Sequence, residues 1–363
     1  MKILKYIFLL LLLSFVSFSV FIATQKGNFS IEKSKIIPTS KSNVYNYVND
    51  AENWQDFMDL LSEDTSLKGQ FSKNTLGKGA QFSWEGSKGA GTIQTFSLKE
   101  NDSIYQKMDW DDSKFKITWV FKDTLGGTKV TVKTVGEMSF SYKISTALHG
   151  GAQKIIGDLF DKSLVNLDRS LVYEINTYKI KVNGLVQKLG TPYLYQSFTS
   201  KISKVVKNSK IVFPKIIAFC KQNKIELNGK PFIIYNTYNE KSGLTNISLC
   251  IPIKKAIITS DGSDILADEL ETFQAIKTTL YGDYSHTKEA LKKSKSYINQ
   301  KVITPGSSFS HIEVFTLSKK EINHPSKWKT DFYFPVKSKN IEVPKQEPET
   351  EELPINEVNP EAI

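Results

Sequence analysis

The stretch that decides the fold runs from Glu271 to Val336 and reads ETFQAIKTTLYGDYSHTKEALKKSKSYINQKVITPGSSFSHIEVFTLSKKEINHPSKWKTDFYFPV. An apolar run ends at Leu280-Tyr281-Gly282, which predicts a strand over residues 272–281 followed by a turn. Residues 286–297 have the spacing of an amphipathic helix, and residues 309–315 and 330–336 are short apolar runs of strand length. The stretch therefore predicts strand, helix, strand and strand, in this order.

The same four-element pattern occurs once before this stretch. The earlier copy has predicted strands over 191–199, 232–238 and 245–253 and a predicted helix over 211–223. Ile251-Pro252-Ile253 matches Phe334-Pro335-Val336 at an offset of 83, and Tyr235 aligns with Phe315 at an offset of 80. A repeated βαββ unit packs its strands into one curved sheet with the helices on one face.

Glu313 is the one carboxylate inside the run His311–Phe315, and two interpretations of it remain open. On a solvated strand face it would be an ordinary surface residue. In an apolar pocket it would cost several kcal/mol to desolvate, so that it would favour a cationic or hydrogen-bonding partner. The first repeat has Ile233 or Ile234 at the corresponding place. His286, His311 and His324 have no partner spacing and are expected on the surface or in loops.

Residues 185–337 resemble the GyrI-like effector-binding domain, which is also the ligand-sensing half of some transcription activators. The resemblance is carried by Leu280-Tyr281-Gly282-Asp283-Tyr284, the helix through Ala290 and Tyr297, the run His311–Phe315, and the closing Thr330–Val336. Phe315 stands where the family often has Tyr, and Asp331 is the acidic residue near the final strand. The resemblance implies a cleft between the two repeats that binds amphipathic or cationic small molecules.

In that cleft the resemblance makes Glu313 the polar anchor, with aromatic neighbours that would add cation–π contacts of about 0.5–2 kcal/mol each. The predicted ligand-contacting residues of this domain are Glu313, Tyr193, Tyr195, Tyr281, Tyr284, Phe315, Trp328 and Tyr333. The alternative is an enzyme, since some members of the family hydrolyse small electrophiles with the Glu and a Tyr as an acid/base pair. Tyr281 or Tyr333 would then supply the hydroxyl.

Residues 28–175 predict one strand, two short helices, a meander of antiparallel strands and a long closing helix from about Tyr142 to Tyr173. This order resembles the START/polyketide-cyclase-like (SRPBCC) helix-grip superfamily. The carriers are the run Ile37–Trp54, the Gly89-Ala90-Gly91 step and the closing helix. The resemblance implies an apolar cavity under the last helix, with Phe82, Trp84, Tyr105, Trp110 and Trp119 as candidate lining residues. The alternative is that these aromatic rings only fill a small core, with Trp110 at a rim.

The N-terminal segment, residues 1–25, is expected to be a membrane anchor. Tyr6 to Ala23 is 18 residues without a charge, close to the length that crosses a hydrocarbon core of about 30 Å. We favour an uncleaved single-pass helix with the body outside the cytoplasm. The alternative is a signal peptide cleaved after Ser19, which would give a secreted or periplasmic protein.

The charge of +10 is uneven. Residues 337–363 carry three Lys and seven Glu, a net of −4, which leaves +14 on residues 1–336. Arg169 is the only Arg, and without guanidinium groups specific nucleic-acid recognition is not expected. Cys220 and Cys250 have no metal-ligand spacing, and no metal or other cofactor is expected. Residues 338–363, rich in Glu and Pro, are predicted to be a disordered acidic tail.

The sequence thus predicts an α+β chain with a helix-grip (START-like) domain over 28–175 and a duplicated βαββ GyrI-like domain over 185–337, preceded by one transmembrane helix. The predicted function is that of a membrane-tethered small-molecule-binding protein, a sensor or carrier whose ligand is hydrophobic or amphipathic and in some cases cationic. A hydrolase that uses Glu313 with a Tyr is the alternative.

Overall fold

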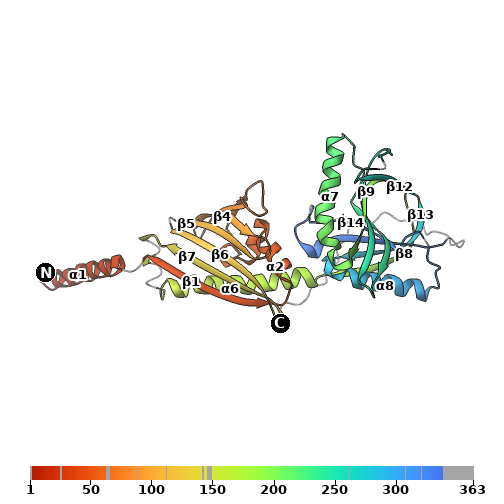
Figure 1. Ribbon diagram of the computed structural model, residues 1–363. Helices are drawn as coiled ribbons and strands as arrows, with labels where there is room; N and C mark the ends of the chain where they lie inside the picture. Colours follow the sequence, from red (N-terminus) through yellow and green to blue (C-terminus); the bar gives the residue numbers. More distant parts are fainter. Residues whose placement is uncertain are drawn as a thin grey trace. The chain divides into compact units, whose positions relative to one another are not determined.

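The computed structural model describes residues 2–24, 27–62, 66–87, 89–111, 113–140, 143–144, 149–260, 262–306, 308–319 and 321–337. The predicted acidic tail lies outside these residues. The chain divides into two compact units, Met1–Tyr173 and Glu174–Ile363 (Figure 1). Each unit is built around its own large antiparallel sheet. The chain is therefore a mixed α+β protein.

The N-terminal helix α1 spans Lys2–Thr24. From Ile3 to Thr24 its mean hydropathy is 2.6, so it is long and apolar enough to cross a membrane by length and composition. Most of its large side chains are exposed, Leu10 and Phe15 among them. An apolar helix that packs against almost nothing in its own chain is what a membrane span requires, although a signal sequence has the same properties.

The first unit has a seven-stranded sheet in the order β1-β7-β6-β5-β4-β3-β2, every neighbouring pair of which is antiparallel. The strands are β1 (Asn28–Ile37), β2 (Lys68–Phe71), β3 (Gln81–Gly86), β4 (Gly89–Lys99), β5 (Ser103–Trp110), β6 (Ser113–Thr124) and β7 (Gly127–Glu137). Short helices follow β1: α2 (Lys41–Val48), the 3-10 turn η1 (Ala51–Asn53), α3 (Trp54–Phe57) and α4 (Asp59–Ser62). The Ser40 side chain caps α2 by accepting a hydrogen bond from the Asn43 backbone N–H.

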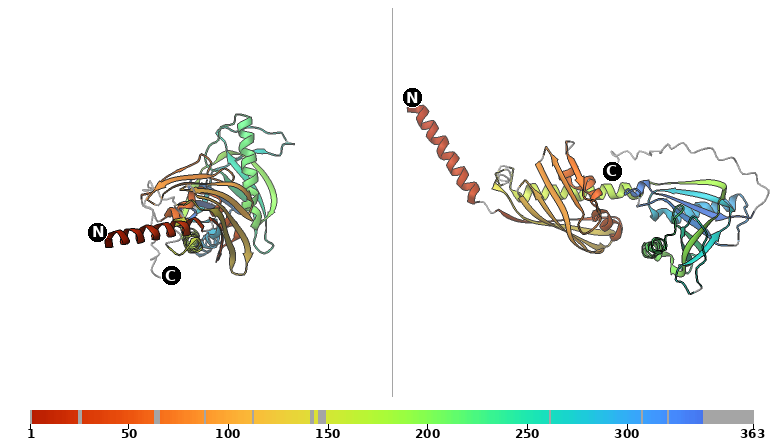
Figure 2. Two further views of the ribbon diagram at one scale, coloured as in Figure 1. Left: turned by 90° about the vertical axis from the view of Figure 1, so that its left-hand side faces the viewer. Right: turned by 90° about the horizontal axis from the view of Figure 1, so that it is seen from above.

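The long helix α6 (Ala152–Asn176) lies along the sheet of the first unit (Figures 1 and 2). Its inward residues, among them Phe160 and Leu167, are buried together with Trp54 and Trp119 of this unit. The predicted start at about Tyr142 lies outside the described residues. Gly150 and Gly151 have φ of +97° and +91°, which a continuous right-handed helix cannot include, so α6 begins after them.

The second unit has an eight-stranded sheet in the order β12-β9-β11-β10-β14-β15-β13-β8. Its strands are β8 (Lys179–Lys188), β9 (Thr191–Lys201), β10 (Phe232–Asn239), β11 (Leu244–Pro252), β12 (Leu266–Leu270), β13 (Phe273–Tyr281), β14 (His311–Leu317) and β15 (Lys329–Pro335). The helices are α7 (Val205–Gln222) and α8 (Thr287–Gln300), with 3-10 turns η2 (Ile202–Lys204), η3 (Tyr284–His286) and η4 (Pro325–Lys327). Helix α7 begins six residues before the predicted start. Its first residues include the β-branched Val205 and Val206 and the polar Asn208 and Ser209, all of which have low helix propensity.

The repeat seen in the sequence is present in the strand register. Phe232 of β10 pairs with Cys250 of β11. Adding the offsets of 80 and 83 gives Ile312 and Tyr333, which are paired between β14 and β15. The two βαββ units, β9-α7-β10-β11 and β13-α8-β14-β15, meet where β10 pairs with β14 in the middle of the sheet.

The outer strands of the two repeats are exchanged. Strand β8 precedes the first repeat but pairs with β13 of the second, and β12 precedes the second repeat but pairs with β9 of the first. The exchange covers the outer edge of each repeat with a segment that belongs, in chain order, to the other. Strand β12 had no counterpart among the sequence predictions, because it is only five residues long.

Both helices pack on one face of this sheet. Helix α7 buries Val212, Ile216 and Cys220 against Ile233 and Tyr235 of β10, in one apolar cluster. Helix α8 buries Ala290 and Leu291 in a second cluster on β13 and β15. A third cluster, which includes Phe232, Ile234 and Ile312, lies on the opposite face, because alternate residues of a strand point to opposite sides.

Candidate ligand-binding site

Glu313 lies at the centre of the second sheet, on the strand where the two repeats meet. Its cross-strand partners are Ile233 on β10 and Phe332 on β15. Residues paired directly across a sheet share a face, and both partners belong to the clusters under α7 and α8. The Glu313 side chain is therefore on the helix-covered face, between the parts of the sheet that the two helices cover.

The carboxyl group of Glu313 is buried and only half satisfied. The residue is 5% exposed, and the Tyr235 hydroxyl donates a hydrogen bond of 2.9 Å to its Oε2. Its Oε1 is buried with no hydrogen-bond partner among the described residues. Burial raises the pKa of Glu313 to about 7, and the Tyr235 hydrogen bond opposes that rise. Of the two interpretations left open by the sequence, the structure supports the buried carboxylate.

His311 lies two residues before Glu313 and on the same face. It is 1% exposed, so its predicted position on the surface was wrong. Its ring stacks on Tyr235 at 4.3 Å and on Phe334 at 5.3 Å, and its Nε2 has no partner among the described residues. Burial lowers the pKa of His311 to about 3, with a smaller contribution from the charge of Lys295. The imidazole is therefore neutral at physiological pH.

Aromatic side chains enclose the carboxyl group. Tyr284, from η3 before α8, contacts Phe315 edge-on at 5.6 Å and stacks on Trp328 at 4.7 Å. Phe213 of α7 contacts Phe315 from the other side at 6.2 Å. Burial raises the pKa of Tyr284, and the charges of Asp283 and Glu313 raise it further. Tyr284 is thus near enough to Glu313 for the charge of Glu313 to raise its pKa. The three predicted residues Tyr284, Phe315 and Trp328 form one group of rings in contact.

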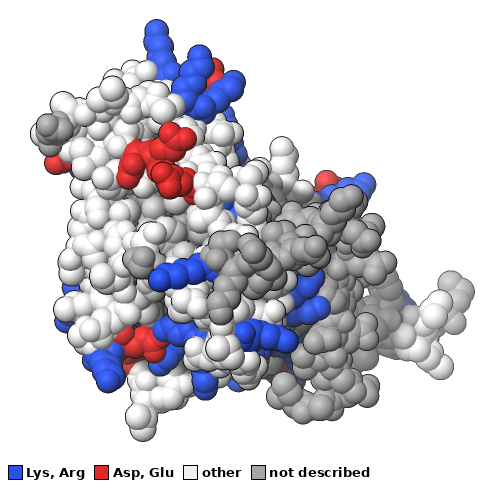
Figure 3. Space-filling view, turned by 90° about the vertical axis from the view of Figure 1, so that its right-hand side faces the viewer, with Lys and Arg blue, Asp and Glu red and all other residues white. Residues whose placement is uncertain are grey.

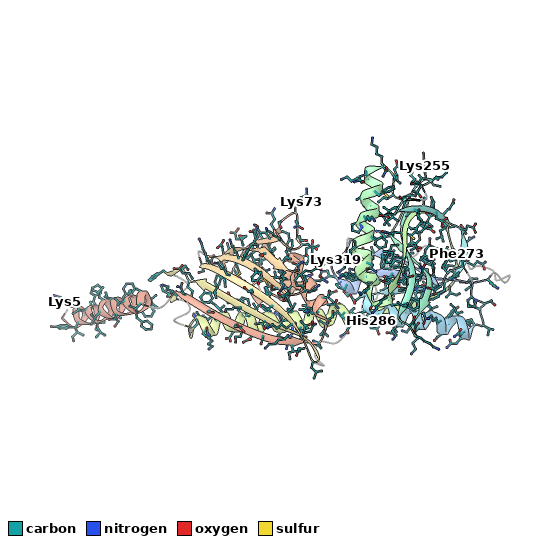
Figure 4. All side chains as sticks on the ribbon, viewed as in Figure 1. Lys5, Lys73, Lys255, Phe273, His286 and Lys319 are labelled. Atoms are coloured by element: carbon teal, nitrogen blue, oxygen red, sulfur yellow. The ribbon has the colours of Figure 1, made fainter. Side chains whose placement is uncertain are left out.

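Four other predicted residues are on the opposite face of the sheet. Tyr333 pairs with Ile312, and Tyr195 pairs with Cys250, which places both on the face away from the helices. Tyr193 shares that face and donates a hydrogen bond of 3.2 Å to Asp268. Tyr281 alternates with Leu280, which is in the α8 cluster, so it also points away. Phe273, which is labelled in Figure 4, is on the same far face. Its ring centre is 5.3 Å from that of Phe309.

The sequence reasoning missed two residues of the Glu313 environment. Tyr235 donates the hydrogen bond to the carboxyl group, and Tyr238 packs edge-on against both Tyr235 and His311. The sequence did indicate a position for Tyr235 beside the site, because Tyr235 aligns with the predicted ligand-contacting residue Phe315 in the repeat. An aromatic residue in each copy, two positions after the Glu313 site, places a ring on both sides of the junction.

The aromatic residues proposed for the first unit have different surroundings. Trp119 is fully buried between Phe57 and Phe160, and its indole N–H donates to Gln106 at 2.9 Å. Phe82 is also fully buried. Tyr105 is on the other face of β5 and is 36% exposed, so it does not line the interior. Trp84 and Trp110 line an open depression at one end of the sheet.

The described residues contain no group of three or more His, Cys, Asp and Glu side chains that could hold a metal ion. Cys220 and Cys250 are free and buried. They are on opposite faces of the second sheet, Cys220 in the α7 cluster and Cys250 in the far cluster. Lysines are spread over the face seen in Figure 3, with smaller acidic groups between them.

Fold and site together define a class: an α+β protein with two antiparallel sheets, one of which buries a half-satisfied carboxyl group at the junction of a repeat. Residues 37–160 match the model of the family described as "Polyketide cyclase / dehydrase and lipid transport". The match covers strands β2 to β7, the short helices and the first part of α6 in the first unit, whereas β1 lies before it except for Ile37. No curated protein matches the chain.

Solved structures resemble parts of the chain at low identity. The C-terminal domain of EcmrR is 16% identical over 44% of this chain and 98% of its own, with a TM-score of 0.37. EcmrR in a DNA complex is 14% identical over 54% of this chain and 69% of its own, with a TM-score of 0.38. Protein CV1439 from Chromobacterium violaceum is 12% identical over 39% of this chain and 94% of its own, with a TM-score of 0.31. These likenesses identify no function.

Proposed function

We propose that the second unit binds a small amphipathic molecule whose cationic or hydrogen-bond-donating group pairs with Glu313. The observation that carries this proposal is the buried Oε1, which has no hydrogen-bond partner among the described residues. A buried acceptor without a partner costs about 1–3 kcal/mol, more when it is charged, and a ligand N–H that reaches it recovers that cost. Tyr235 holds the other oxygen and fixes the direction in which Oε1 is presented.

The aromatic group of Tyr284, Phe315 and Trp328 gives the apolar part of such a ligand a surface to pack on. Tyr284 and Trp328 follow β13 and precede β15 on short 3-10 turns, outside the sheet ladder. Because Glu313 is enclosed, entry of a ligand requires these two rings to move apart. Displacing this stacked pair breaks no strand hydrogen bond, although it breaks the bond of 2.8 Å that the Trp328 indole N–H donates to the Ile322 backbone carbonyl.

The pKa of Glu313 near 7 makes the preference for cations depend on pH. Below about pH 7 the Glu313 carboxyl group is protonated in the ligand-free protein, and its burial then costs little free energy. A cationic ligand favours the ionised form and binds with release of a proton, so its affinity rises as the pH rises through about 7. An uncharged ligand of the same shape shows no such rise.

The test uses two naphthalene probes of equal shape, 1-naphthylmethylamine and 1-naphthylmethanol, on the full chain in detergent. We expect the amine to bind more tightly than the alcohol at pH 8. Glu313→Gln should remove that preference, a loss of about thirty-fold or more for the amine. The matched control is Glu226→Gln, which removes an exposed carboxylate of the same unit that pairs with Lys254. Equal amine affinity in Glu313→Gln and wild type contradicts the proposal.

Tethering to a membrane through α1, with a role as sensor or carrier, is the wider proposal. It is supported by the length and apolar composition of α1, and the family match of the first unit supports small-molecule binding there. The body would lie outside the cytoplasm, or the protein would be secreted or periplasmic if Ser19 ends a cleaved signal. Mass spectrometry of the intact mature protein decides between the two, since cleavage removes 19 residues.

A hydrolase is the second candidate, because a hydroxyl and a carboxylate are held together at 2.9 Å. The hydroxyl belongs to Tyr235, whereas the predicted Tyr281 and Tyr333 are on the far face. Burial and the adjacent Glu313 raise the pKa of Tyr235 well above its ordinary value, which makes it a weak proton donor. Turnover of a small epoxide by wild type, Glu313→Gln and Tyr235→Phe tests this candidate. Equal rates in the three proteins exclude it.

A further inference from the structure

The last turn of α6 contacts the two short turns that close the Glu313 site, η3 and η4, which we call the lid turns. From Glu174 onward α6 belongs to the second compact unit. Glu174 is 6% exposed. Its Oε2 accepts a hydrogen bond of 2.9 Å from the Ser326 backbone N–H, and its Oε1 is 3.0 Å from Nδ1 of His324. One carboxylate therefore contacts two residues at the start of η4, the turn that leads directly to Trp328.

The helix itself does not account for a carboxylate at this place. The last turn of a helix is the negative end of its dipole, and burial withdraws the group from water, so both effects disfavour Glu174 there. The start of η4 gives the reason for it. His324, the N-cap residue of η4, makes no side-chain capping bond, so the Ser326 N–H would otherwise lack an acceptor. Glu174 thus caps η4 from 152 residues away in the chain.

The next residue of α6 contacts the other lid turn. The Ile175 backbone carbonyl is 2.8 Å from Nε2 of His286, which is the last residue of η3 and is labelled in Figure 4. A carbonyl oxygen only accepts, so Nε2 carries the proton and donates it. The His286 ring also stacks on Tyr178 at 3.5 Å. Because η3 begins at Tyr284, it is held two residues away from the ring that stacks on Trp328.

The lid turns are also joined to each other. The Gly282 backbone N–H, just before η3, donates a hydrogen bond of 2.9 Å to the Trp328 backbone carbonyl, just after η4. Gly282 has φ of +123°, and a Cβ on it would lie 2.5 Å from Cβ of Tyr178, so glycine is needed for this close approach. Residues 174–178, which we call the latch, therefore contact both lid turns and the residue that joins them.

We propose that Glu174 is a positioning residue of the Glu313 site. Through Ser326 and His324 it keeps the turn that carries Trp328 closed over Glu313, and it thereby sets how fast a ligand enters and leaves. This inference rests on the proposed function, because it takes the parting of the stacked rings as the way in for a ligand.

The latch acts on rates rather than on affinity. Its bonds form in the closed state, with or without a ligand inside, so they cancel in the equilibrium between free and bound protein. They are broken in the open state, through which a ligand passes in either direction. Loss of Glu174 therefore raises the association and dissociation rates by the same factor. Since hydrogen bonds to a charged group are stronger than neutral ones, we expect an increase of about tenfold for Glu174→Ala.

The first measurement follows the opening of the lid turns without a ligand, by hydrogen exchange in NMR of the full chain in detergent. The Trp328 indole N–H donates to the Ile322 backbone carbonyl, so its exchange reports the opening. Its signal is the one that Trp328→Phe removes from the five indole signals. Glu174→Ala should speed this exchange about tenfold and leave the backbone amides of β10 and β14 unchanged. No acceleration of the indole exchange overturns the proposal.

An equal acceleration of the β10 and β14 amides would mean that Glu174 only stabilises the fold, and it overturns the proposal as well. The matched control is Asp161→Ala, which removes a carboxylate of α6 that pairs with Lys33 in the first unit. This variant should leave the Trp328 indole exchange at the wild-type rate.

Two conservative variants test the separate bonds of the latch. Glu174→Gln keeps an acceptor for the Ser326 N–H but loses the charge, so its indole exchange should fall between those of wild type and Glu174→Ala. His286→Phe keeps a ring to stack on Tyr178 and loses only the bond to the Ile175 carbonyl. It should speed the exchange about threefold. Wild-type exchange in both variants overturns the proposal.

The second measurement is stopped-flow mixing of 1-naphthylmethylamine with the same proteins at pH 8. In Glu174→Ala both rate constants should rise about tenfold, with Kd within about twofold of wild type. A weaker Kd with an unchanged association rate would indicate a damaged pocket and overturns the proposal. Faster indole exchange without binding of the amine by any of the proteins rejects the proposed function and still supports the role of Glu174 in holding η4.

Discussion

The two repeats of the second unit have the same topology and register but opposite polarity at one position. Ile233 and Glu313 are equivalent by the offset of 80, and they are also directly paired across the junction of β10 and β14. Ile233 is buried in the apolar cluster under α7. The other is a carboxyl group with one orphaned oxygen. Because the fold accepts Ile at one of these places, the carboxylate at the other is not a general requirement of the repeat, which agrees with the binding role that we propose for it.

Making the two halves alike should have the largest effect. Ile233→Glu places a second carboxyl group directly opposite Glu313 in the same buried space. Two adjacent buried carboxyl groups cannot both ionise, and Glu313 forms no ion pair with any described residue, so we expect a loss of about 4 kcal/mol in the free energy of unfolding at pH 8. Urea unfolding followed by tryptophan fluorescence measures it. Ile233→Gln is the control for polarity without charge, and a loss as large in that variant would contradict the electrostatic explanation.

Removing the carboxyl group of Glu313 tests whether its burial lowers the free energy of unfolding. Between pH 4.5 and about pH 7 the folded protein keeps a proton on Glu313 that the unfolded chain has released. The folded state then binds more protons, so this group lowers stability as the pH rises through that window, by up to about 3 kcal/mol.

Glu313→Gln should remove that dependence and be more stable than wild type at pH 8 but not at pH 4. The measurement is the free energy of unfolding of both proteins at a series of pH values. Subtracting the two curves cancels the contribution of His311, whose lowered pKa acts in the opposite direction between about pH 3 and pH 6.5. A difference that is constant with pH would show that the pKa of Glu313 is the same in the folded and the unfolded protein.

The hydrogen bond that Tyr235 donates to Glu313 accounts for a smaller part of the difference between the two repeats. In Tyr235→Phe the ionised carboxylate loses its only described donor, so the pKa of Glu313 should rise above about 7. We expect a loss of about 2 kcal/mol in the free energy of unfolding at pH 8 and less at pH 5. Carbon-13 NMR of the labelled Glu carboxyl group reads the pKa directly. Tyr238→Phe keeps the hydrogen bond from Tyr235 to Glu313, so it should leave the pKa of Glu313 unchanged.

Helices α7 and α8 also differ at one equivalent position, and this difference should have the smallest effect on stability. Pro214 lies inside α7, whereas Ser296 is at the equivalent place in α8 by the offset of 82 between the helix starts. Pro removes one backbone hydrogen bond but also restricts the unfolded chain, and the two effects partly cancel. Pro214→Ala should stabilise the protein by about 1 kcal/mol in thermal unfolding, with Ser296→Ala within about 0.5 kcal/mol of wild type. A destabilised Pro214→Ala would show that the Pro214 ring itself contributes to packing.

Sequence patterns predicted the elements better than they predicted the site. Alternation and turn residues located most strands of the two sheets, although not β12, and the Pro252–Pro335 match gave the repeat with its register. Glu313 stood out because it is a charge in an apolar run. The domain boundaries and the ligand contacts of the predicted residues remain predictions.

What failed was the choice of face for the aromatic residues. The residues Tyr193, Tyr195, Tyr281 and Tyr333 are in strands of the same sheet as Glu313, yet the two-residue period of a strand sends them to the other side. That error was avoidable, since Tyr333 is adjacent to Phe332, the pairing partner of Glu313. The burial of His311 was not readable from its neighbours, because it depends on contacts from Phe334 and Tyr238 that only the folded sheet brings together.

The exchange of strands β8 and β12 has a consequence for how the chain is made. Lys179 at the start of β8 pairs with Tyr281, which leaves the ribosome 102 residues later. At about 5–20 residues per second the strand waits some 5–20 s for its partner. During that interval neither repeat can close its sheet, so the second unit should become protected from proteases in one late step during synthesis. Truncated chains that end after β11 would carry a complete first repeat and still remain open to cleavage.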